Sequence, residues 1–130
     1  MARIRPVDEA DAIRARVPDA LRAYGETRAS VLAAGIVDQP LKDLCARYIA
    51  EEDEVVNYST SDAFGERERA ALDWTHAIVW NSDGADEDLW RRLHSHFSEP
   101  ELVELGYFIA FKLGQSHWLR SLGFDKRDTI

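Results

Sequence analysis

The strongest constraint on the fold comes from residues 98–101, with the sequence SEPE, and from the apolar run that follows them. A serine three residues before a glutamate forms a capping box, and a proline in the first turn of a helix costs no hydrogen bond. We therefore expect a helix to begin at Ser98, with Phe97 packed against Leu102, and to end at Gly123. Apolar residues occupy most of its circumference, which predicts that this helix is the centre of the domain or is shared with a neighbouring subunit.

Four other stretches show the helical spacing of apolar residues, and they cover residues 18–34, 38–52, 66–80 and 86–97. Residues 55–60 are β-prone by type, but no second strand pattern exists to pair with them, so we expect a loop or a continuation of helix. The sequence thus predicts an all-α helical bundle of about five to six helices, in a single domain over residues 1–130. We expect residues 1–17 to form a helical turn or an N-terminal arm, and residues 124–130 to form a polar tail.

The composition is that of a folded globular protein, because 45% of the 130 residues are hydrophobic and 31% are charged. Sixteen lysines and arginines stand against 24 acidic residues, which gives a net charge of −8. Since the basic residues do not cluster, a phosphate backbone would be repelled, and we expect no nucleic-acid partner. The start of the chain lacks the apolar segment of a secretory signal, and Glu104, Gly106 and Lys112 interrupt the longest apolar stretch. We therefore expect a cytoplasmic protein that does not span a membrane.

Residues 40–62 are the best place to look for a functional site. Their first part is an amphipathic helix, and the only cysteine of the chain, Cys45, lies on its apolar face. A reactive thiol needs a base, a cation or a helix N-terminus close by, so Cys45 is either a small buried hydrophobe or a nucleophile. Asp43 is either the acid of a pocket or a first-turn acid favoured by the helix dipole. The acidic run at residues 51–54 predicts a solvated helix end.

The four histidines do not have the spacing of a metal site. His94 and His96 would point about 200° apart on a regular helix, so the pair cannot chelate one ion. A single cysteine also excludes a multi-cysteine zinc site and an intramolecular disulfide. His117 lies beside Trp118 in the apolar C-terminal helix, which is more typical of a core or interface residue than of a ligand. We expect no metal and no cofactor.

Four segments of the chain resemble the carboxymuconolactone decarboxylase family, which includes the alkylhydroperoxidase-D-like proteins. They are LKDLCARYIA from Leu41, ERERAALDWTHAI from Glu66, LWRRLHSHFSEPELVELGYFIA from Leu89 and WLRSLG from Trp118. The most specific part is the succession of ERERAAL, a short helix and F-S-x-x-E-x-V-E-L. The resemblance spans roughly residues 41–123. It implies an all-α fold that assembles into trimers or hexamers, with pockets at or near the subunit contacts.

The resemblance also implies positions for redox chemistry. Redox members of the family carry an acid, then a Cys-x-x-Cys pair that reduces peroxide, then a histidine that shares a proton relay with the acid. Aligned on Leu41, the acid falls on Asp43, the two cysteines fall on Val55 and Tyr58, and the histidine falls on Asp62. Only Asp43 keeps the residue type of the pattern. A valine cannot attack a peroxide, so we do not expect the Cys-x-x-Cys peroxidase mechanism in this chain.

Three functions remain open from the sequence. The first is a family member that binds a small organic molecule, with lactone- or decarboxylase-like proton chemistry in which Asp43 is the acid or base and Tyr58 and Asp62 line the pocket. The second is a non-catalytic family member that keeps the oligomer and has lost the site. The third is a peroxidase that uses Cys45 alone together with an external thiol. The resemblance implies a homotrimer or homohexamer.

Overall fold

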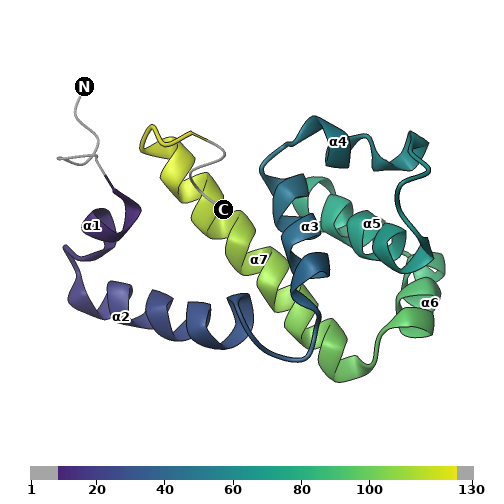
Figure 1. Ribbon diagram of the computed structural model, residues 1–130, viewed down its shortest axis with the longest axis horizontal. Helices are drawn as coiled ribbons and strands as arrows, with labels where there is room; N and C mark the ends of the chain where they lie inside the picture. Colours follow the sequence, from purple (N-terminus) through teal and green to yellow (C-terminus); the bar gives the residue numbers. More distant parts are fainter. Residues whose placement is uncertain (1–8, 126–130) are drawn as a thin grey trace.

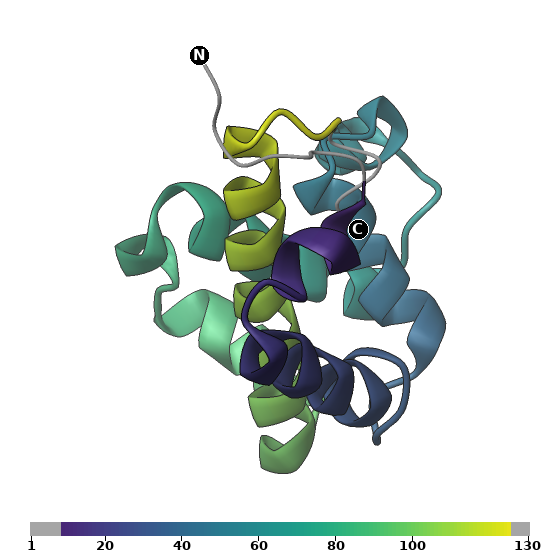
Figure 2. The same cartoon turned by 90° about the vertical axis from the view of Figure 1, so that its left-hand side faces the viewer.

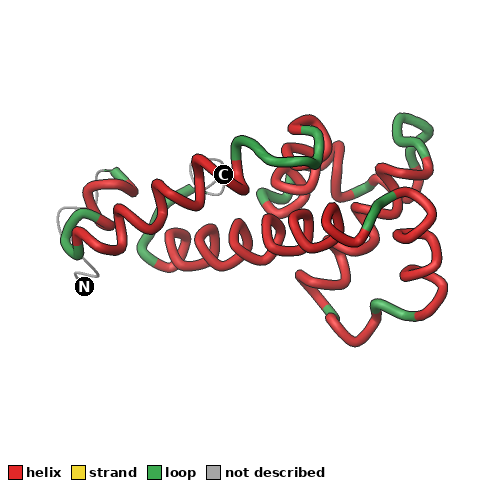
Figure 3. Tube along the Cα trace, turned by 90° about the horizontal axis from the view of Figure 1, so that it is seen from below, coloured by secondary structure: helices red, strands yellow, loops and turns green. Residues whose placement is uncertain are grey.

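Helix α7 (Glu99–Ser121) runs through the molecule, and the other helices pack along it (Figure 1). The computed structural model describes residues 9–125, in which the regular elements are helices and no strand occurs (Figure 3). The other α-helices are α1 (Ala10–Arg14), α2 (Pro18–Thr27), α3 (Gln39–Ile49), α4 (Asp53–Val56), α5 (Glu66–Trp80) and α6 (Glu87–His96). Single turns of π- or 3₁₀-helix cover Arg28–Leu32, Tyr58–Thr60 and Ser82–Gly84. The predicted all-α fold is confirmed, and α1 and α4 account for the α-helices beyond the expected number.

Helix α7 begins with the capping box that the sequence predicts. The Ser98 backbone N–H donates to Glu101 Oε1 (2.8 Å), and the Glu101 N–H donates to Ser98 Oγ (3.3 Å). One face of the helix is buried against α3 and α5, whereas Val103 and Tyr107 are 72% and 51% exposed. Helix α7 is therefore central to the bundle and still leaves part of its apolar surface uncovered. Within residues 9–125, no helix combines the length and apolarity that crossing a membrane requires.

The core lies where α3, α5 and α7 meet. Ala70 and Ala71 on α5 are completely buried, and their small side chains allow the neighbouring helices to approach closely. The larger side chains that α3, α5 and α7 contribute to this core include Leu41, Ile49, Trp74, Leu105, Phe108 and Ile109, and Cys45 lies among them. A second, smaller cluster packs α4 and the 58–60 turn against α3 and α5, and it contains Leu44, Tyr48, Val55, Tyr58 and Leu72. Since full burial of one such side chain stabilises the fold by about 1.5–3 kcal/mol, these two clusters hold the bundle together.

Helix α3 begins as predicted but ends early. The Asp38 carboxylate caps it by accepting the backbone N–H three residues further on (3.3 Å). We expected this helix to reach about Glu52, and that boundary was wrong, because its last residue is Ile49 and Glu51 has a left-handed φ of 62°. The chain turns here because Val55 is completely buried in the second cluster, so the backbone must return to the protein after a single exposed turn.

The N-terminal helices α1 and α2 lie on the opposite side of α7 from α3–α6 (Figures 1 and 2). Arg14 on α1 is only 6% exposed, because its guanidinium stacks on the Tyr24 ring at 3.5 Å and donates to Gln115 Oε1 on α7 (2.9 and 3.2 Å). Tyr24 in turn stacks on Phe111 of α7. Residues 10–27 are therefore held against α7. Residues 1–8 of the predicted arm and residues 126–130 of the predicted tail lie outside the described residues.

A buried ion pair joins the segment between α2 and α3 to α7. Lys42 is completely buried, and its ammonium lies 3.1 Å from Glu104 Oε2 while it donates to the carbonyls of Val31 (2.7 Å) and Ala34 (2.5 Å). The same Glu104 carboxylate accepts two backbone N–H groups of residues 36 and 37, at 3.1 and 2.7 Å. Gly35 has a φ of 103°, and a Cβ there would lie 2.0 Å from Glu104 Oε1. The Glu104 carboxylate can therefore lie against the backbone of residue 35 only because that residue is glycine.

Candidate functional site

The residues that the sequence singles out lie in different environments. Asp43 is exposed on α3, where its carboxylate accepts from Gln39 Nε2 (2.9 Å) at a cavity of about 280 Å³. Tyr58 is buried in the second cluster, and its hydroxyl donates to Asp73 on α5. Asp62 is exposed in the loop before α5. The structure thus gives Asp43, Tyr58 and Asp62 separate surroundings, where the sequence led us to expect one shared pocket.

Cys45 is completely buried in the main core, on the apolar face that the sequence predicted for it. Burial raises the pKa of its thiol from the ordinary value of 9.0 to about 12, and a hydrogen bond with the Thr75 side chain opposes this only in part. The thiolate is the nucleophilic form of cysteine, so the environment of Cys45 suits a packing residue better than a reactive one.

We expect Cys45 in the native protein to react with Ellman's reagent more slowly, by about a hundredfold or more, than in the protein unfolded by urea. The reason is that the native thiol is both inaccessible and protonated. The release of thionitrobenzoate measures the rate, and Cys45→Ala gives the background. Native labelling as fast as that of the unfolded chain would show that the core opens around this residue.

A hydrogen-bonded cluster of polar side chains surrounds Tyr58. Asp73 accepts from the Tyr58 hydroxyl through one carboxylate oxygen and lies 2.8 Å from Arg92 Nη1 through the other. Beside it, the Tyr48 hydroxyl shares a hydrogen bond with His76 Nδ1. Neither Asp73, His76 nor Arg92 was a candidate from the sequence, although the spacing of Asp73 and His76, three residues apart, places both on one face of α5.

Both tyrosines of this cluster favour their protonated form. Burial comes first among the causes that raise the pKa of Tyr58, followed by its hydrogen bond to Asp73 and the negative charge of that carboxylate. Burial likewise raises the pKa of Tyr48, although its hydrogen bond with Trp80 opposes the shift. Both hydroxyls therefore keep their protons at neutral pH, and the bonds of Asp73 to Tyr58 and Arg92 hold the 58–60 turn against α5 and α6.

This arrangement predicts a loss of stability in alkali. Because the folded protein holds the Tyr58 proton more tightly than the unfolded chain does, the stabilisation is complete below the unfolded pKa of 10.0 and is lost as the pH rises above it. Urea unfolding between pH 8 and 11 should show the decline, and Tyr58→Phe should make it shallower. Equal slopes for Tyr58→Phe and the unmodified protein would contradict the prediction.

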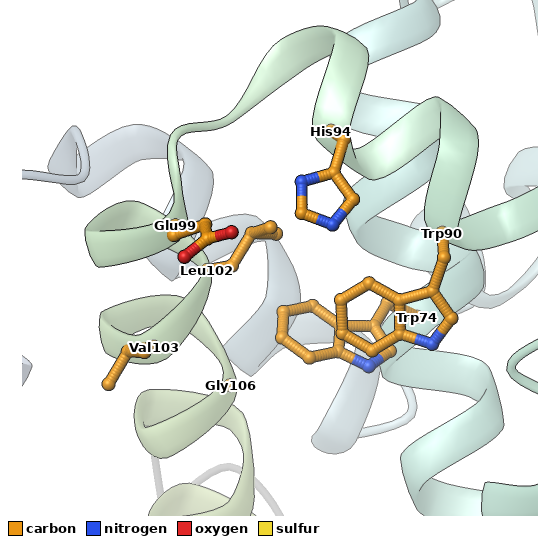
Figure 4. A pocket seen from close by; sticks show the side chains of 7 residues that line it. All are labelled: Trp74, Trp90, His94, Glu99, Leu102, Val103 and Gly106. Carbon is orange, nitrogen blue, oxygen red and sulfur yellow. The ribbon is translucent and has the colours of Figure 1, made fainter.

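An apolar cavity opens between α5, α6 and α7 (Figure 4). It has a volume of about 450 Å³, and its lining residues are Trp74, Trp90, His94, Glu99, Leu102, Val103 and Gly106. We call it the tryptophan cleft. The Trp74 and Trp90 rings meet edge to face with their centroids 5.3 Å apart. The centroid of the His94 ring lies 5.9 Å from that of Trp90. Two indoles held in this way offer a rigid aromatic surface to a ligand.

The polar groups of the tryptophan cleft come from the junction of α6 and α7. Figure 4 shows the His94 ring and the Glu99 carboxylate directed toward the space beside the two indoles. Gly106 lies next to Trp74, and a Cβ at this position would come 2.7 Å from Trp74 Cη2. The glycine therefore lets the indole approach α7 closely. A mostly apolar cleft with one carboxylate and one imidazole suits an aromatic molecule that carries a hydrogen-bond donor.

Within the part of the chain that the structure describes, no three His, Cys, Asp or Glu side chains converge on a position that could hold a metal ion. Comparison of the chain with models of protein families, with curated proteins and with solved structures gives no match. The case for a function therefore lies in the geometry of the cavities and of the residues that line them.

Proposed function

We propose that this protein is an oligomeric helical protein of the carboxymuconolactone decarboxylase type that binds a small, flat, mostly apolar organic molecule in the tryptophan cleft. The observation that carries the proposal is the pair of edge-to-face indoles, Trp74 and Trp90, on the side of a cavity of about 450 Å³. A large apolar cavity with a few convergent polar groups is the usual form of a small-molecule site. His94 and Glu99 are the groups at this cavity that can exchange protons, so a reaction there would be a proton transfer.

Binding of indole tests this proposal. We expect isothermal titration calorimetry to detect indole binding, and we expect Trp90→Ala to weaken it about tenfold or more, equivalent to about 1.4 kcal/mol, because one aromatic surface is lost. The matched control is Trp80→Ala, since Trp80 is 65% exposed on α5 and does not line the cleft. Equal affinity of the Trp90→Ala variant and the unmodified protein would overturn the proposal.

The polar edge of the cleft can be tested with a second ligand. 1-Methylindole has nearly the shape of indole but lacks its N–H donor, so it cannot donate to Glu99 or His94. We expect it to bind more weakly than indole, and we expect Glu99→Gln to reduce the difference between the two ligands. A constant preference in both proteins would show that the carboxylate plays no part in recognition.

The proposed oligomer is a homotrimer or homohexamer in which α7 contributes to the subunit contact. The uncovered apolar side chains of Val103 and Tyr107, together with the exposed Ala110, support this, because one helix rarely exposes so much apolar surface without a partner. Light scattering should report three or six times the chain mass of 14.8 kDa. A mass near that of one chain would refute the oligomer and leave the ligand proposal intact.

A further inference from the structure

The two lysines of the described residues differ in how their amines are used. The chain has three lysines, at positions 42, 112 and 126, and the last lies outside residues 9–125. The Lys42 ammonium is buried and satisfied by Glu104 and two carbonyl oxygens. Lys112 on α7, by contrast, is half-buried and forms no salt bridge or hydrogen bond through its amine with any residue in 9–125; its Nζ lies 6.0 Å from the centre of the Phe108 ring. The Lys112 amine is therefore left without a hydrogen-bond or ion-pair partner among residues 9–125.

Lys112 lines the cavity of about 280 Å³ between α3, the 28–32 turn and α7, together with Leu32, Gln39, Asp43, Ala46, Arg47 and Phe108. Asp43, the acid that the sequence singled out, thus shares a cavity with a lysine that the sequence did not. Arg47 uses Nε for Glu52 (2.6 Å) and Nη2 for Glu54 (3.4 Å), which leaves Nη1 without a partner in residues 9–125. The cavity therefore combines an apolar surface, an unpaired amine, a carboxylate and a guanidinium donor.

The surroundings of Lys112 lower the pKa of its side-chain amine. Burial is the main cause that lowers the pKa of this amine, and the positive charge of Arg28 lowers it further, whereas Asp43 acts in the opposite direction. Desolvation next to other cations is the setting in which a lysine becomes a nucleophile toward carbonyl compounds. In a chain with a net charge of −8, this local excess of cations also favours an anionic ligand.

We infer that Lys112 is a carbonyl-binding residue whose side-chain amine condenses with a small oxo acid in the cavity that it shares with Asp43 and Arg47. The amine nitrogen attacks the carbonyl carbon, and the carbonyl oxygen leaves as water after proton exchange. The product is a carbon–nitrogen double bond, formed without oxidation or reduction and reversed by hydrolysis. Asp43 is the group in the cavity that can accept and return the proton, and the free Nη1 of Arg47 can donate to the carboxylate of the oxo acid.

This inference goes beyond the proposed function, because neither Lys112 nor Asp43 lines the tryptophan cleft. The test is reductive trapping with pyruvate as the oxo acid and cyanoborohydride as the hydride donor, which converts the double bond to a stable secondary amine. Peptide mass spectrometry locates the adduct on residue 42, 112 or 126. We expect Lys112 to be trapped about ten times faster or more than the side chain of Nα-acetyl-lysine amide under the same conditions. Trapping no faster than in this reference would overturn the inference.

Three variants separate the roles. Lys112→Arg keeps the positive charge and should abolish the adduct at position 112. Asp43→Asn should slow trapping without changing the circular dichroism of the protein, and an unchanged rate would remove Asp43 from the reaction. Trp90→Ala should leave trapping unaffected, so the two proposals can fail independently.

Acetone, an uncharged ketone, tests whether the carboxylate of pyruvate is recognised. We expect acetone to show a smaller rate advantage over the reference amine than pyruvate does. An equal advantage would exclude recognition of the carboxylate by Arg47.

Discussion

Replacement of Lys42 by methionine is expected to lower the free energy of unfolding by about 3–5 kcal/mol. Lys42 is completely buried, and methionine fills a similar volume without the positive charge. The change would leave the carbonyl oxygens of Val31 and Ala34 without their donor and the Glu104 carboxylate, only 14% exposed, without its cation. Removal of one member of a buried ion pair costs more than the pair contributes, because a desolvated charge is left uncompensated.

Urea unfolding followed by circular dichroism at pH 7 measures this loss. Lys112→Met is the matched control, since this lysine lies on the neighbouring helix and has no ion pair within residues 9–125. The double variant Lys42→Met/Glu104→Gln should recover part of the stability, because it removes both charges while the new amide oxygen can still accept from the N–H groups of residues 36 and 37. A loss below about 1 kcal/mol for the single variant would mean that the pair is much more hydrated than its burial indicates.

Replacement of Gly106 by alanine is expected to lower the free energy of unfolding by about 1–3 kcal/mol and to weaken indole binding about tenfold or more. The added Cβ would lie 2.7 Å from Cη2 and 3.1 Å from Cζ2 of Trp74. Because Trp74 is only 9% exposed and packs edge to face on Trp90, its ring has no free space to move into except the tryptophan cleft. The same methyl group therefore strains the core and narrows the proposed binding site.

A second glycine of the same helix provides the control for Gly106→Ala. Gly114 also lies on α7, but nothing comes within 4 Å of a Cβ placed there. Gly114→Ala should therefore stabilise the helix by about 0.5–1 kcal/mol, as expected for alanine in place of glycine inside a helix. Calorimetry with indole and urea unfolding of both variants separate the two effects. Equal indole affinities and equal free energies of unfolding of the two variants would show that Trp74 moves aside without an energetic cost.

The sequence carried enough information to predict the helices, because the signals that define them are local. The capping box at Ser98, the cap at Asp38 and the helical spacing of residues 66–80 depend on neighbours within one or two turns, and the structure confirms all three. The end of α3 was missed by three residues, because it depends on Val55 reaching a cluster formed with Leu72 of α5. That contact lies between segments whose distance the sequence does not show.

The tertiary structure decided which side chains share a cavity. A resemblance within residues 40–62 grouped Asp43 with Tyr58, yet α3 presents Asp43 beside Lys112 of α7, and Tyr58 reaches Asp73 of α5 instead. Lys42 was not a candidate for any role, although it is the most deeply buried charge of the described residues.

The sequence by itself therefore determined that the chain forms helices and where most of them begin, and it placed Cys45 on the apolar face of one of them. Only the tertiary structure decided that Trp74 and Trp90 form one cleft and that Lys112 faces the cavity of Asp43. The physical reason is the range of the interactions. Hydrogen bonds and apolar contacts within a helix repeat over three or four residues, whereas a cavity forms between helices whose separation and rotation depend on the packing of the whole core.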